Sequence, residues 1–302
     1  MTHFTGPLRR IGLYANPVSG RGRGVPAAAQ LRGILADAGH IVLDVTAQSA
    51  AEGRVRAYEA VRSGAIDALA VVGGDGTAHL GANACAGTDI PLVVVPAGTG
   101  NDNARSLGMP RKDIPAIARL ISAGHTRRID VGRCVTPDGE RWWLGVLGGG
   151  FDTLVNTRGR TLKALHGTPR YLAAVALELP RFNGIPYAVQ VDDQRRETQA
   201  MLVAVANGGT FGGGMKVCPD ASMTDGLFDV MILHQIGRGE FLKIFPKVFS
   251  GGHVTHPAVE ILRGRHVRLE SDGIDSQADG EDFLPLPVDL ETVPGALAVV
   301  AP

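Results

Sequence analysis

The sequence is poor in cysteine and aromatic residues, and it lacks the long apolar run of a membrane-spanning helix. Its three cysteines, Cys85, Cys134 and Cys218, are far apart and form no C-x-x-C pair. We therefore expect neither a disulfide framework nor a structural zinc site, but three semi-buried thiols in a reducing cytosol. No stretch approaches the roughly 18 apolar residues of a transmembrane helix, and residues 1–10 lack the apolar core of a signal peptide. We expect a cytoplasmic protein that at most lies on the inner face of a membrane.

Net charge is also lacking, because 30 basic residues balance 30 acidic ones. A nucleic-acid partner is not expected, since the affinity of nucleic-acid binders comes mainly from neutralising phosphates. Hydrophobic residues make up 44% of the chain, which is too many for a disordered protein. Glycine, by contrast, is in excess: the chain has 41 glycines, where average usage would give about 21. The length of 302 residues suits one large domain or two ordinary ones.

Several phosphate-binding and catalytic motifs are absent. No lysine follows a glycine anywhere, so the chain has no G-x-x-x-x-G-K-[ST] loop and is not a P-loop NTPase. The H-R-D and D-F-G motifs of protein kinases and the G-x-S-x-G elbow of hydrolases are missing as well. G-x-G-x-x-G is absent from the first strand–helix turn, which disfavours a standard dinucleotide-binding fold.

The first part of the chain alternates strand and helix patterns. The predicted strands are 11–15, 41–45, 68–72 and 92–95, and the predicted helices are 26–38, 50–62 and 77–85. Continuous apolar strands such as 68–72 are typical of a parallel sheet that is buried on both faces. This order predicts a three-layer α/β domain with a mostly parallel sheet over residues 1–126.

Strand patterns dominate the rest of the chain. The predicted strands are 129–135, 142–147, 187–191, 199–206, 228–233 and 266–269, with helical patterns at 171–179 and 240–249. We expect a β-rich domain over residues 127–287. The C-terminal segment 288–302 contains the apolar run 297–300, a strand that could return to either domain, the N-terminal one included.

Thirteen of the glycines lie in four clusters, and at least the first two clusters directly follow predicted strands. In an open α/β sheet, ligands bind beyond the carboxyl ends of the strands. Glycine there lets backbone N–H groups approach a phosphate, and the N-terminus of a following helix favours negative charge. The glycine excess is therefore concentrated where a nucleotide would lie.

The first cluster reads Gly73-Gly74-Asp75-Gly76-Thr77. It predicts a phosphate loop in which Asp75 meets a bound Mg²⁺, directly or through water, and Thr77 caps the next helix. The alternative is an ordinary tight turn with a capping residue. The second cluster, P-A-G-T-G-N-D at 96–102, allows the same two interpretations. Two such loops after two strands are much rarer by chance than one.

Together these segments resemble the diacylglycerol kinase catalytic-domain family, which includes bacterial diacylglycerol kinases and sphingosine and ceramide kinases. The resemblance runs nearly end to end. The segments that carry it are N-P-V-S-G at 16–20, G-G-D-G-T at 73–77, P-A-G-T-G-N-D-N-A-R-S-L-G at 96–108, G-G-G-F-D at 148–152, the stretch 212–230 with D-G-L-F-D, and D-G-E at 279–281. G-G-D-G alone is shared with NAD kinases and phosphofructokinases, whereas the combination is specific.

The resemblance implies a fold and a reaction. The fold is an α/β domain followed by a β-sandwich-like domain, with ATP in the cleft between them. The reaction is Mg²⁺-dependent transfer of the γ-phosphoryl group of ATP to a lipid hydroxyl, with diacylglycerol or a related lipid as the expected acceptor. Phosphoryl transfer needs phosphate positioning, a metal to spread charge and a carboxylate to accept the hydroxyl proton.

The resemblance also implies roles for individual residues. Those expected to bind ATP and its metal are Asn16, Thr46, Gly73, Gly74, Asp75, Gly76, Thr77, Thr99 and Asp102. Asp75 and Asp102 would hold the network of metal and water. Asp279 would be the general base, and Glu281 would ligate the metal or support its ligands. Without the family match, Asp279 and Gly280 would be read as a plain D-G turn.

A second, structural Mg²⁺ is implied on the D-G-L loop, where bacterial members of the family hold one. It would be bound by the carboxylate of Asp225 and by the carbonyls of Ser222 and Leu227, an oxygen-only shell that suits Mg²⁺. The alternative is that Asp225 and Gly226 only make a turn.

The segment 240–249 has the pattern of an amphipathic helix that could rest on an anionic membrane. The residues that give this pattern are Phe241, Ile244, Phe245, Val248 and Phe249, with Lys243 and Lys247. Such a stripe more often packs in the core, and Pro246 predicts a kink or a break.

Two other functions stay open on the sequence. One is an NAD kinase-like enzyme, although the segments 16–20 and 96–102 weigh against it. The other is an inactive lipid- or nucleotide-binding regulator, against which the joint presence of Asp75, Asp102 and Asp279 argues. The sequence sets neither the acceptor lipid nor the oligomeric state, and it leaves a homodimer open.

Overall fold

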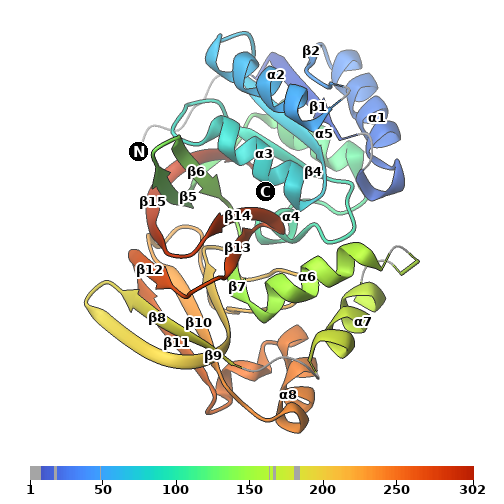
Figure 1. The fold of residues 1–302 in the computed structure, drawn as a ribbon. Coiled ribbons are helices and arrows are strands. Elements are labelled where there is room, and N and C mark those ends of the chain that lie inside the picture. The colour runs from blue at the N-terminus through green and yellow to red at the C-terminus, as the bar shows by residue number, and fades with distance from the viewer. Residues whose placement is uncertain (1–7, 17–18, 48, 163, 166–167, 180–183) are drawn as a thin grey trace. The chain divides into compact units, whose positions relative to one another are not determined.

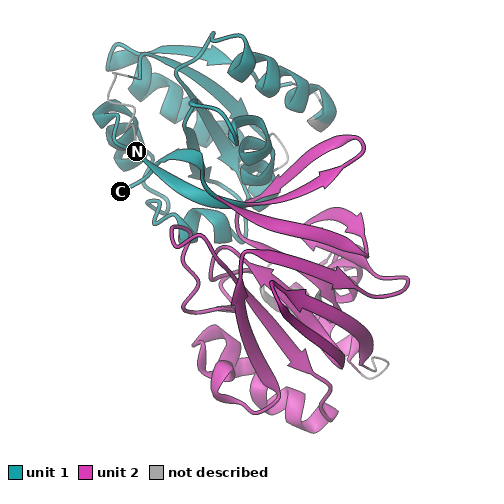
Figure 2. Ribbon diagram, turned by 90° about the vertical axis from the view of Figure 1, so that its left-hand side faces the viewer, with its two compact units in different colours: residues 1–131, 294–302 teal, residues 132–293 magenta. Residues whose placement is uncertain are grey.

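The computed structural model describes residues 8–16, 19–47, 49–162, 164–165, 168–179 and 184–302. Contacts within the chain divide it into two compact units (Figures 1 and 2). Unit 1 comprises residues 1–131 and 294–302, and unit 2 comprises residues 132–293. No helix in the described part of the chain is long and apolar enough to cross a membrane.

Strands and helices alternate along unit 1, as predicted. Its strands are β1 (Arg10–Ala15), β2 (Ile41–Asp44), β3 (Ala68–Gly73) and β4 (Leu92–Pro96). Its helices are the 3₁₀ turn η1 (Ser19–Arg21), α1 (Gly24–Asp37), α2 (Ala50–Arg62), α3 (Asp75–Cys85), α4 (Asp102–Ser106) and α5 (Ile114–Ala123). Helices α4 and α5 were not predicted.

The sheet of unit 1 has the order β4-β3-β1-β2, and all these neighbours are parallel. Every residue of β3 is buried, which fits its unbroken apolar sequence. Helix α1 packs with α5, and α2 packs with α3, so that helices cover the two faces of the sheet (Figure 1). This confirms the predicted three-layer α/β architecture.

The C-terminal strand β15 (Val288–Val300) contributes to both units. Its first residues pair antiparallel with β12 (His266–Glu270) in unit 2. Its last residues belong to unit 1, where Val299 pairs in parallel with Leu92 of β4. The predicted strand 297–300 is thus the end of a much longer strand.

The remaining elements begin with β5 (Thr126–Thr136), which enters unit 2. The other strands of unit 2 are β6 (Gly139–Trp143), β7 (Val146–Gly150), β8 (Ile185–Val191), β9 (Gln194–Ala206), β10 (Phe228–His234), β11 (Val259–Gly264), β13 (Asp275–Ala278) and β14 (Glu281–Pro285). Its helices are α6 (Phe151–Thr161), α7 (Thr168–Glu178), α8 (Arg238–Ile244) and the 3₁₀ helices η2 (Phe245–Phe249) and η3 (Gly252–Thr255). Strands β11, β13 and β14 and helix α6 were not predicted.

Antiparallel pairing organises unit 2 around the long strand β9, which pairs with β7, β8 and β10. One core cluster lies among the strands and includes Trp143, whose ring stacks on Phe228 with centroids 5.4 Å apart. A second cluster lies under the helices and joins Phe151 of α6, Val175 of α7 and Phe241 of α8. The β-rich second part and its sandwich-like architecture are as predicted.

The prediction of one strand over 142–147 is wrong, because the chain forms two strands, β6 and β7, with a break at Leu144 and Gly145. The backbone N–H groups of these two residues donate to the carboxylate of Asp279. A side chain therefore takes the hydrogen bonds that a continuous strand would give to a neighbour.

Candidate active site

The turn between β3 and α3 is the centre of the candidate site in unit 1. Gly73 ends β3, Gly74 is the N-cap residue, and α3 begins at Asp75. A Cβ atom on Gly73 would lie 2.1 Å from Oγ1 of Thr77, so no side chain fits there. Thr77 is only 4% exposed and sits inside the first turn of α3. The prediction that Thr77 caps α3 is therefore wrong.

A second glycine loop, between β4 and α4, touches the first. A Cβ atom on Gly98 would lie 2.4 Å from Cα of Gly74. The N–H of Gly98 donates to the carbonyl of Gly73 over 3.0 Å, which holds the two loops together. Asn101, at φ 56°, brings its Oδ1 to 2.9 Å from the same N–H. The loops after two neighbouring parallel strands thus approach to backbone contact, which only glycine permits.

The loop after β1 joins them. Gly20 has φ 55°, and a Cβ atom on it would lie 2.0 Å from the carbonyl oxygen of Ala97. The guanidinium of Arg23 donates to the carbonyl of Gly20 over 2.8 Å and to that of Gly98 over 3.3 Å. Three loops at the carboxyl ends of parallel strands therefore form one backbone-lined surface, with an arginine beside it. A space that Cβ atoms would fill is the arrangement that lets N–H groups contact phosphate.

Asn16 and Thr46 lie at the ends of β1 and β2. The Nδ2 of Asn16 donates to Oγ1 of Thr77 over 3.4 Å, which links the loop after β1 to the loop after β3. The Oγ1 of Thr46 accepts the N–H of Ala15 over 3.0 Å and so supports the end of β1. Thr99 is exposed at the tip of the loop after β4. All three predicted nucleotide contacts thus belong to the loops at one edge of the sheet.

Asp75 and Asp102 are brought close together by the backbone. Oδ1 of Asp75 accepts the N–H of Asn103 over 2.9 Å, next to Asp102 in the chain. Asp102 is 6% exposed, and its carboxylate is bonded to Arg105. Among the described residues, no group of three or more His, Cys, Asp or Glu side chains is arranged to hold a metal. This donor set suits a cation bound chiefly by phosphate oxygens and water, as Mg²⁺ is in nucleotide sites.

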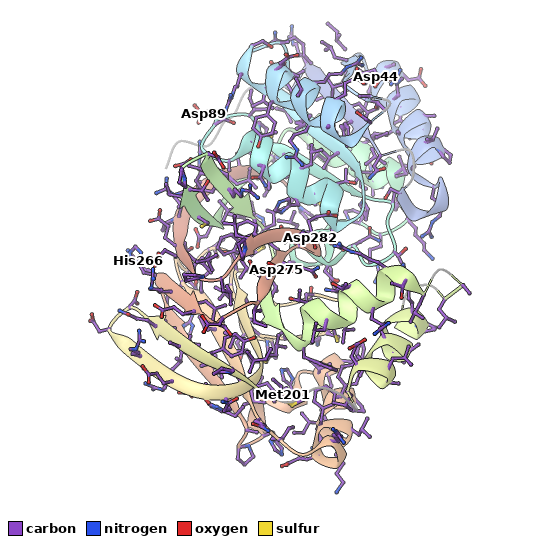
Figure 3. The ribbon with its side chains drawn as sticks, in the orientation of Figure 1. Asp44, Asp89, Met201, His266, Asp275 and Asp282 are labelled. Carbon is purple, nitrogen blue, oxygen red and sulfur yellow. The ribbon has the colours of Figure 1, made fainter. Side chains whose placement is uncertain are left out.

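Asp279 lies in the tight hairpin turn between β13 and β14. Figure 3 labels Asp275 in β13 and Asp282 in β14. Asp279 and Gly280 have φ 55° and 82°, as a two-residue type I′ turn requires. The carboxylate is buried and accepts the N–H of Leu144 at 3.0 Å and of Gly145 at 2.8 Å. The D-G turn predicted as the alternative is thus present, and it also holds a buried, oriented carboxylate.

Glu281 opens β14 directly after this turn. Its side chain is exposed, whereas Asp279 is buried. The turn therefore separates the two acids that the D-G-E motif had placed in one site: Asp279 is positioned by the backbone, and Glu281 faces solvent.

The D-G-L loop of unit 2 is built around Asp225. Its Oδ1 accepts the N–H of Leu227 over 3.1 Å, and its Oδ2 is bonded to Arg263. Ser222 bonds through its hydroxyl to Thr224. An Asx turn of this kind is what the alternative to a metal site predicts. A cation on the Asp225 carboxylate would compete with Arg263.

Asp229 was missed as a candidate, although it ends the same motif. It is 4% exposed, and its Oδ2 has no hydrogen-bond partner among the described residues. Burial, together with the nearby carboxylates of Asp225 and Asp220, raises the pKa of Asp229 above its ordinary value despite the neighbouring Arg263. This unsatisfied oxygen is the structural feature of the loop that suits a hard cation.

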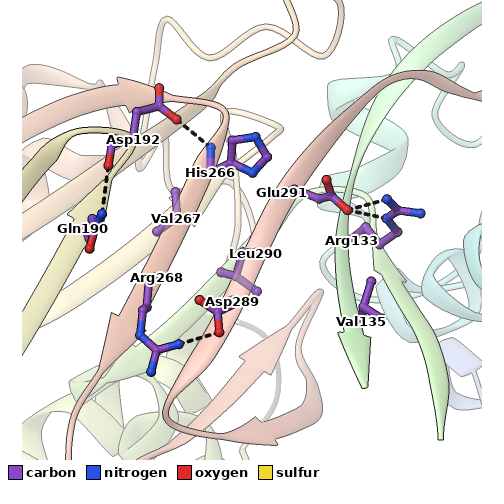
Figure 4. Close-up of a pocket in the computed structure, with 10 residues that line it drawn as sticks. All are labelled: Arg133, Val135, Gln190, Asp192, His266, Val267, Arg268, Asp289, Leu290 and Glu291. Carbon is purple, nitrogen blue, oxygen red and sulfur yellow. Dashed lines mark hydrogen bonds and ion pairs between the residues drawn. The ribbon is translucent and has the colours of Figure 1, made fainter. Parts of the chain in front are cut away.

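A groove between β5, β8, β12 and β15 is a second candidate anion site, in unit 2 (Figure 4). It has a volume of about 310 Å³ and contains two arginines, Arg133 and Arg268. Arg133 is bonded to Glu291 and Arg268 to Asp289. Because both cations are already paired with carboxylates, the groove does not favour a phosphate.

Two family matches cover the chain. The diacylglycerol kinase catalytic domain matches residues 10–134, and the YegS C-terminal NAD kinase beta sandwich-like domain matches residues 145–301. The chain is 37% identical over 304 aligned residues to a diacylglycerol kinase of Mycobacterium tuberculosis, with 98% of each chain covered. It is 29% identical to a diacylglycerol kinase of Bacillus subtilis, with 91% of this chain and 90% of the relative covered.

The fold has solved counterparts as well. A crystal structure of a diacylglycerol kinase from Bacillus anthracis superposes with a TM-score of 0.75. It is 21% identical in sequence, and the superposition covers 99% of this chain and 98% of the other. At this identity the likeness supports the two-part fold.

Proposed function

Because this chain belongs to the diacylglycerol kinase catalytic-domain family, we propose that it is an ATP- and Mg²⁺-dependent lipid kinase. Its substrate is the hydroxyl of diacylglycerol or of a related lipid, to which it transfers the γ-phosphoryl group of ATP. The observation that carries the proposal is the contact of the glycine loops, in which Gly98 meets Gly74 and Gly20 meets Ala97.

The glycine loops of unit 1 bind the phosphates. Their N–H groups and the N-terminus of α3 supply partial positive charge, and the absent side chains give the phosphates room. Arg23 adds a formal positive charge beside the loops, where P-loop proteins would have a lysine. Asn16 and Thr46 fix the loop ends at which the nucleotide lies.

Asp75 and Asp102 hold the Mg²⁺ that accompanies ATP, through water and phosphate oxygens. When bound, Mg²⁺ spreads the negative charge that develops on the phosphates. Arg105 keeps the carboxylate of Asp102 in one orientation.

Asp279 accepts the proton of the lipid hydroxyl. A carboxylate offers about four acceptor sites, and the two N–H groups of Leu144 and Gly145 fix its plane. A held base raises the rate because it needs no reorientation before the proton transfer. Glu281 is a weaker candidate because it is exposed.

The test is the substitution Asp279→Asn, which keeps the size of the side chain and tolerates the positive φ of the turn. With radiolabelled ATP and a panel of lipids, we expect the wild-type chain to label diacylglycerol or a related lipid. The variant should lose at least about a hundredfold in kcat and should still bind ATP in calorimetry. Glu281→Gln is the matched control and should retain most of the activity.

Three outcomes would contradict the proposal. Phosphorylation of NAD in place of lipid would identify a cofactor kinase, and ATP binding without transfer to any lipid would identify a regulator. Full activity of the Asp279→Asn variant would remove Asp279 from the role of base.

A further inference from the structure

The apolar residues exposed on this protein are concentrated on the helices of unit 2. Ten large hydrophobic residues are exposed in the described part of the chain. Six of them lie in or beside α6, α7, α8 and η2: Leu154, Leu165, Leu172, Leu177, Leu242 and Phe249. These helices lie in one part of unit 2 (Figure 1) and contribute to one core cluster. Because contiguous exposed apolar patches mark interaction sites, these helices are the part of the described chain in which to look for one.

The segment formed by α8 and η2 has two different faces. Phe241 and Ile244 are buried, whereas Leu242 is 58% and Phe249 is 36% exposed. Helix α8 ends at Ile244, and η2 begins at Phe245, as Pro246 predicted. The segment 240–249, predicted to be either a core stripe or a membrane helix, thus combines buried core residues with exposed apolar ones.

The inner face cannot itself take a lipid chain. Phe241, Ile244, Phe245 and Val248 line a cavity of about 60 Å³. A cavity that binds benzene has a volume of roughly 150 Å³, so an acyl chain does not fit into this smaller one. The outer face is the part of the segment that can meet a large partner.

Three exposed lysines lie on or beside the same segment. Only five of the 30 basic residues are lysines: Lys112, Lys163, Lys216, Lys243 and Lys247. Lys243 and Lys247 are exposed on α8 and η2, and the N–H of Lys216 donates to the carbonyl of Val248, which places it alongside. Among the described residues, ion pairs involve arginines and histidines, and none involves these three lysines. The one acid on the segment, Glu240, faces His256.

We propose that this docking face, formed by Leu242, Phe249, Lys216, Lys243 and Lys247, binds the surface of an anionic lipid bilayer. Exposed apolar side chains beside unpaired lysines are the composition of interfacial helices, because the lysines meet the headgroups and the apolar side chains insert below them. The choice of a lipid partner over a protein rests on the proposed function.

Aromatic rings of the core pack beneath the exposed Phe249 of the docking face. The ring of Phe249 contacts that of Phe245, with centroids 6.3 Å apart, and Phe245 stacks on Phe241 at 5.6 Å. Phe241 meets Phe151 at 5.4 Å, in the core under the helices. A ladder of rings therefore holds the exposed Phe249 in place, so that its insertion into a bilayer costs little conformational entropy.

The test is co-sedimentation of the full chain with phosphatidylcholine vesicles, with and without phosphatidylglycerol. We expect binding to the anionic vesicles that weakens with added salt. The variants Leu242→Ser with Phe249→Ser, and Lys243→Gln with Lys247→Gln, should each lower the partition coefficient on the order of tenfold. Val55→Ser, on an equally exposed position of α2, and Lys112→Gln are the matched controls. Circular dichroism checks that each variant is folded.

The outcomes separate this proposal from the kinase activity, because sedimentation needs no turnover. Turnover of a water-soluble short-chain diacylglycerol should be unchanged in the docking-face variants. Equal binding of variants and wild type, or no binding of the wild type to anionic vesicles, would overturn the proposal. It would also be overturned if the docking-face variants only abolished a dimer in sedimentation velocity, since the face would then join two copies of the chain.

Discussion

Gly98 shows how closely the candidate site depends on single atoms. Its Cα faces Gly74 across two loops that lie far apart in the sequence. Sequence patterns predicted glycine loops at these positions, because glycine after a buried strand is a local signal. They did not predict that the loops touch, nor that Arg23 bridges Gly20 and Gly98, because these contacts depend on the parallel order of β1, β3 and β4.

The substitution Gly98→Ala should therefore disrupt ATP binding more than folding. The new methyl group would meet backbone atoms of Gly74, which cannot move away as a flexible side chain could. We expect the Kd for ATP to rise at least about tenfold, while the thermal midpoint falls by only a few degrees. Calorimetry and thermal unfolding measure the two effects. The matched control is Gly33→Ala, where a Cβ atom meets nothing within 4 Å and φ is not positive. An unchanged Kd for Gly98→Ala would show that the loops do not bind the nucleotide.

Asp279 illustrates what sequence reasoning could not reach at this scale. Its two N–H donors, on Leu144 and Gly145, are more than a hundred residues away in the chain. Only the family resemblance drew attention to Asp279, since the local pattern predicts a D-G turn and the backbone indeed forms one. The exposed position of Glu281 and the unsatisfied oxygen of Asp229 had no local signal either.

At the scale of elements, apolar runs predicted the parallel strands well. A strand that is buried on both faces must be apolar throughout, so β1, β3 and β4 stand out in the sequence. Strand β13 was missed because it carries the polar residues Ser276 and Gln277, which are buried in the structure, and β14 was missed because it begins with two acids. The hydroxyl of Ser276 donates to the carbonyl of Leu284, so tertiary hydrogen bonds replace the expected apolar pattern.

The start of β1 depends on one carboxylate. Asp67 accepts the N–H groups of Arg9 and Arg10 through Oδ2, and its Oδ1 bonds the guanidinium of Arg10. Burial alone would raise the pKa of Asp67, but the hydrogen bonds from Arg10 and Arg9 outweigh it and lower the pKa below its ordinary value. The carboxylate form is thus favoured in the folded state.

Asp67→Asn should destabilise the protein at pH 7 by about 1 kcal/mol. Because the folded-state pKa is lowered, the stability from Asp67 is present above the unfolded pKa of about 3.9 and is lost as pH falls through the folded value. The difference between wild type and variant in urea unfolding should therefore shrink in acid. Asp37→Asn, on the exposed end of α1, provides the control. A difference that does not depend on pH would contradict the charge-based explanation.

For the whole molecule, the three cysteines report on global folding. Cys85, Cys134 and Cys218 are free, and they are buried more deeply than the semi-buried thiols expected from the sequence. Burial raises the pKa of each thiol above its ordinary value, which suppresses the reactive thiolate. One of the three lies in unit 1 and two lie in unit 2.

Native protein should therefore react slowly with a thiol reagent at pH 8, and all three thiols should react after unfolding in guanidinium. Labelling should follow the opening of each unit, because no thiol is accessible in the folded state. Mass spectrometry of the labelled peptides assigns the rates to unit 1 or unit 2. Rapid labelling of a single cysteine in native buffer would contradict this expectation.

The path of β15 determines when the sheet of unit 1 can be completed during synthesis on the ribosome. Unit 1 needs the segment after Pro294, whose Ala296 accepts the N–H of Gly87 and whose Val299 pairs with Leu92. That segment leaves the ribosome only after all of unit 2 has been synthesised. Until then the nascent N-terminal part carries an open edge at β4, where other chains can pair. Strand β15 is therefore both the last strand to be synthesised and the strand that covers the open edge of β4.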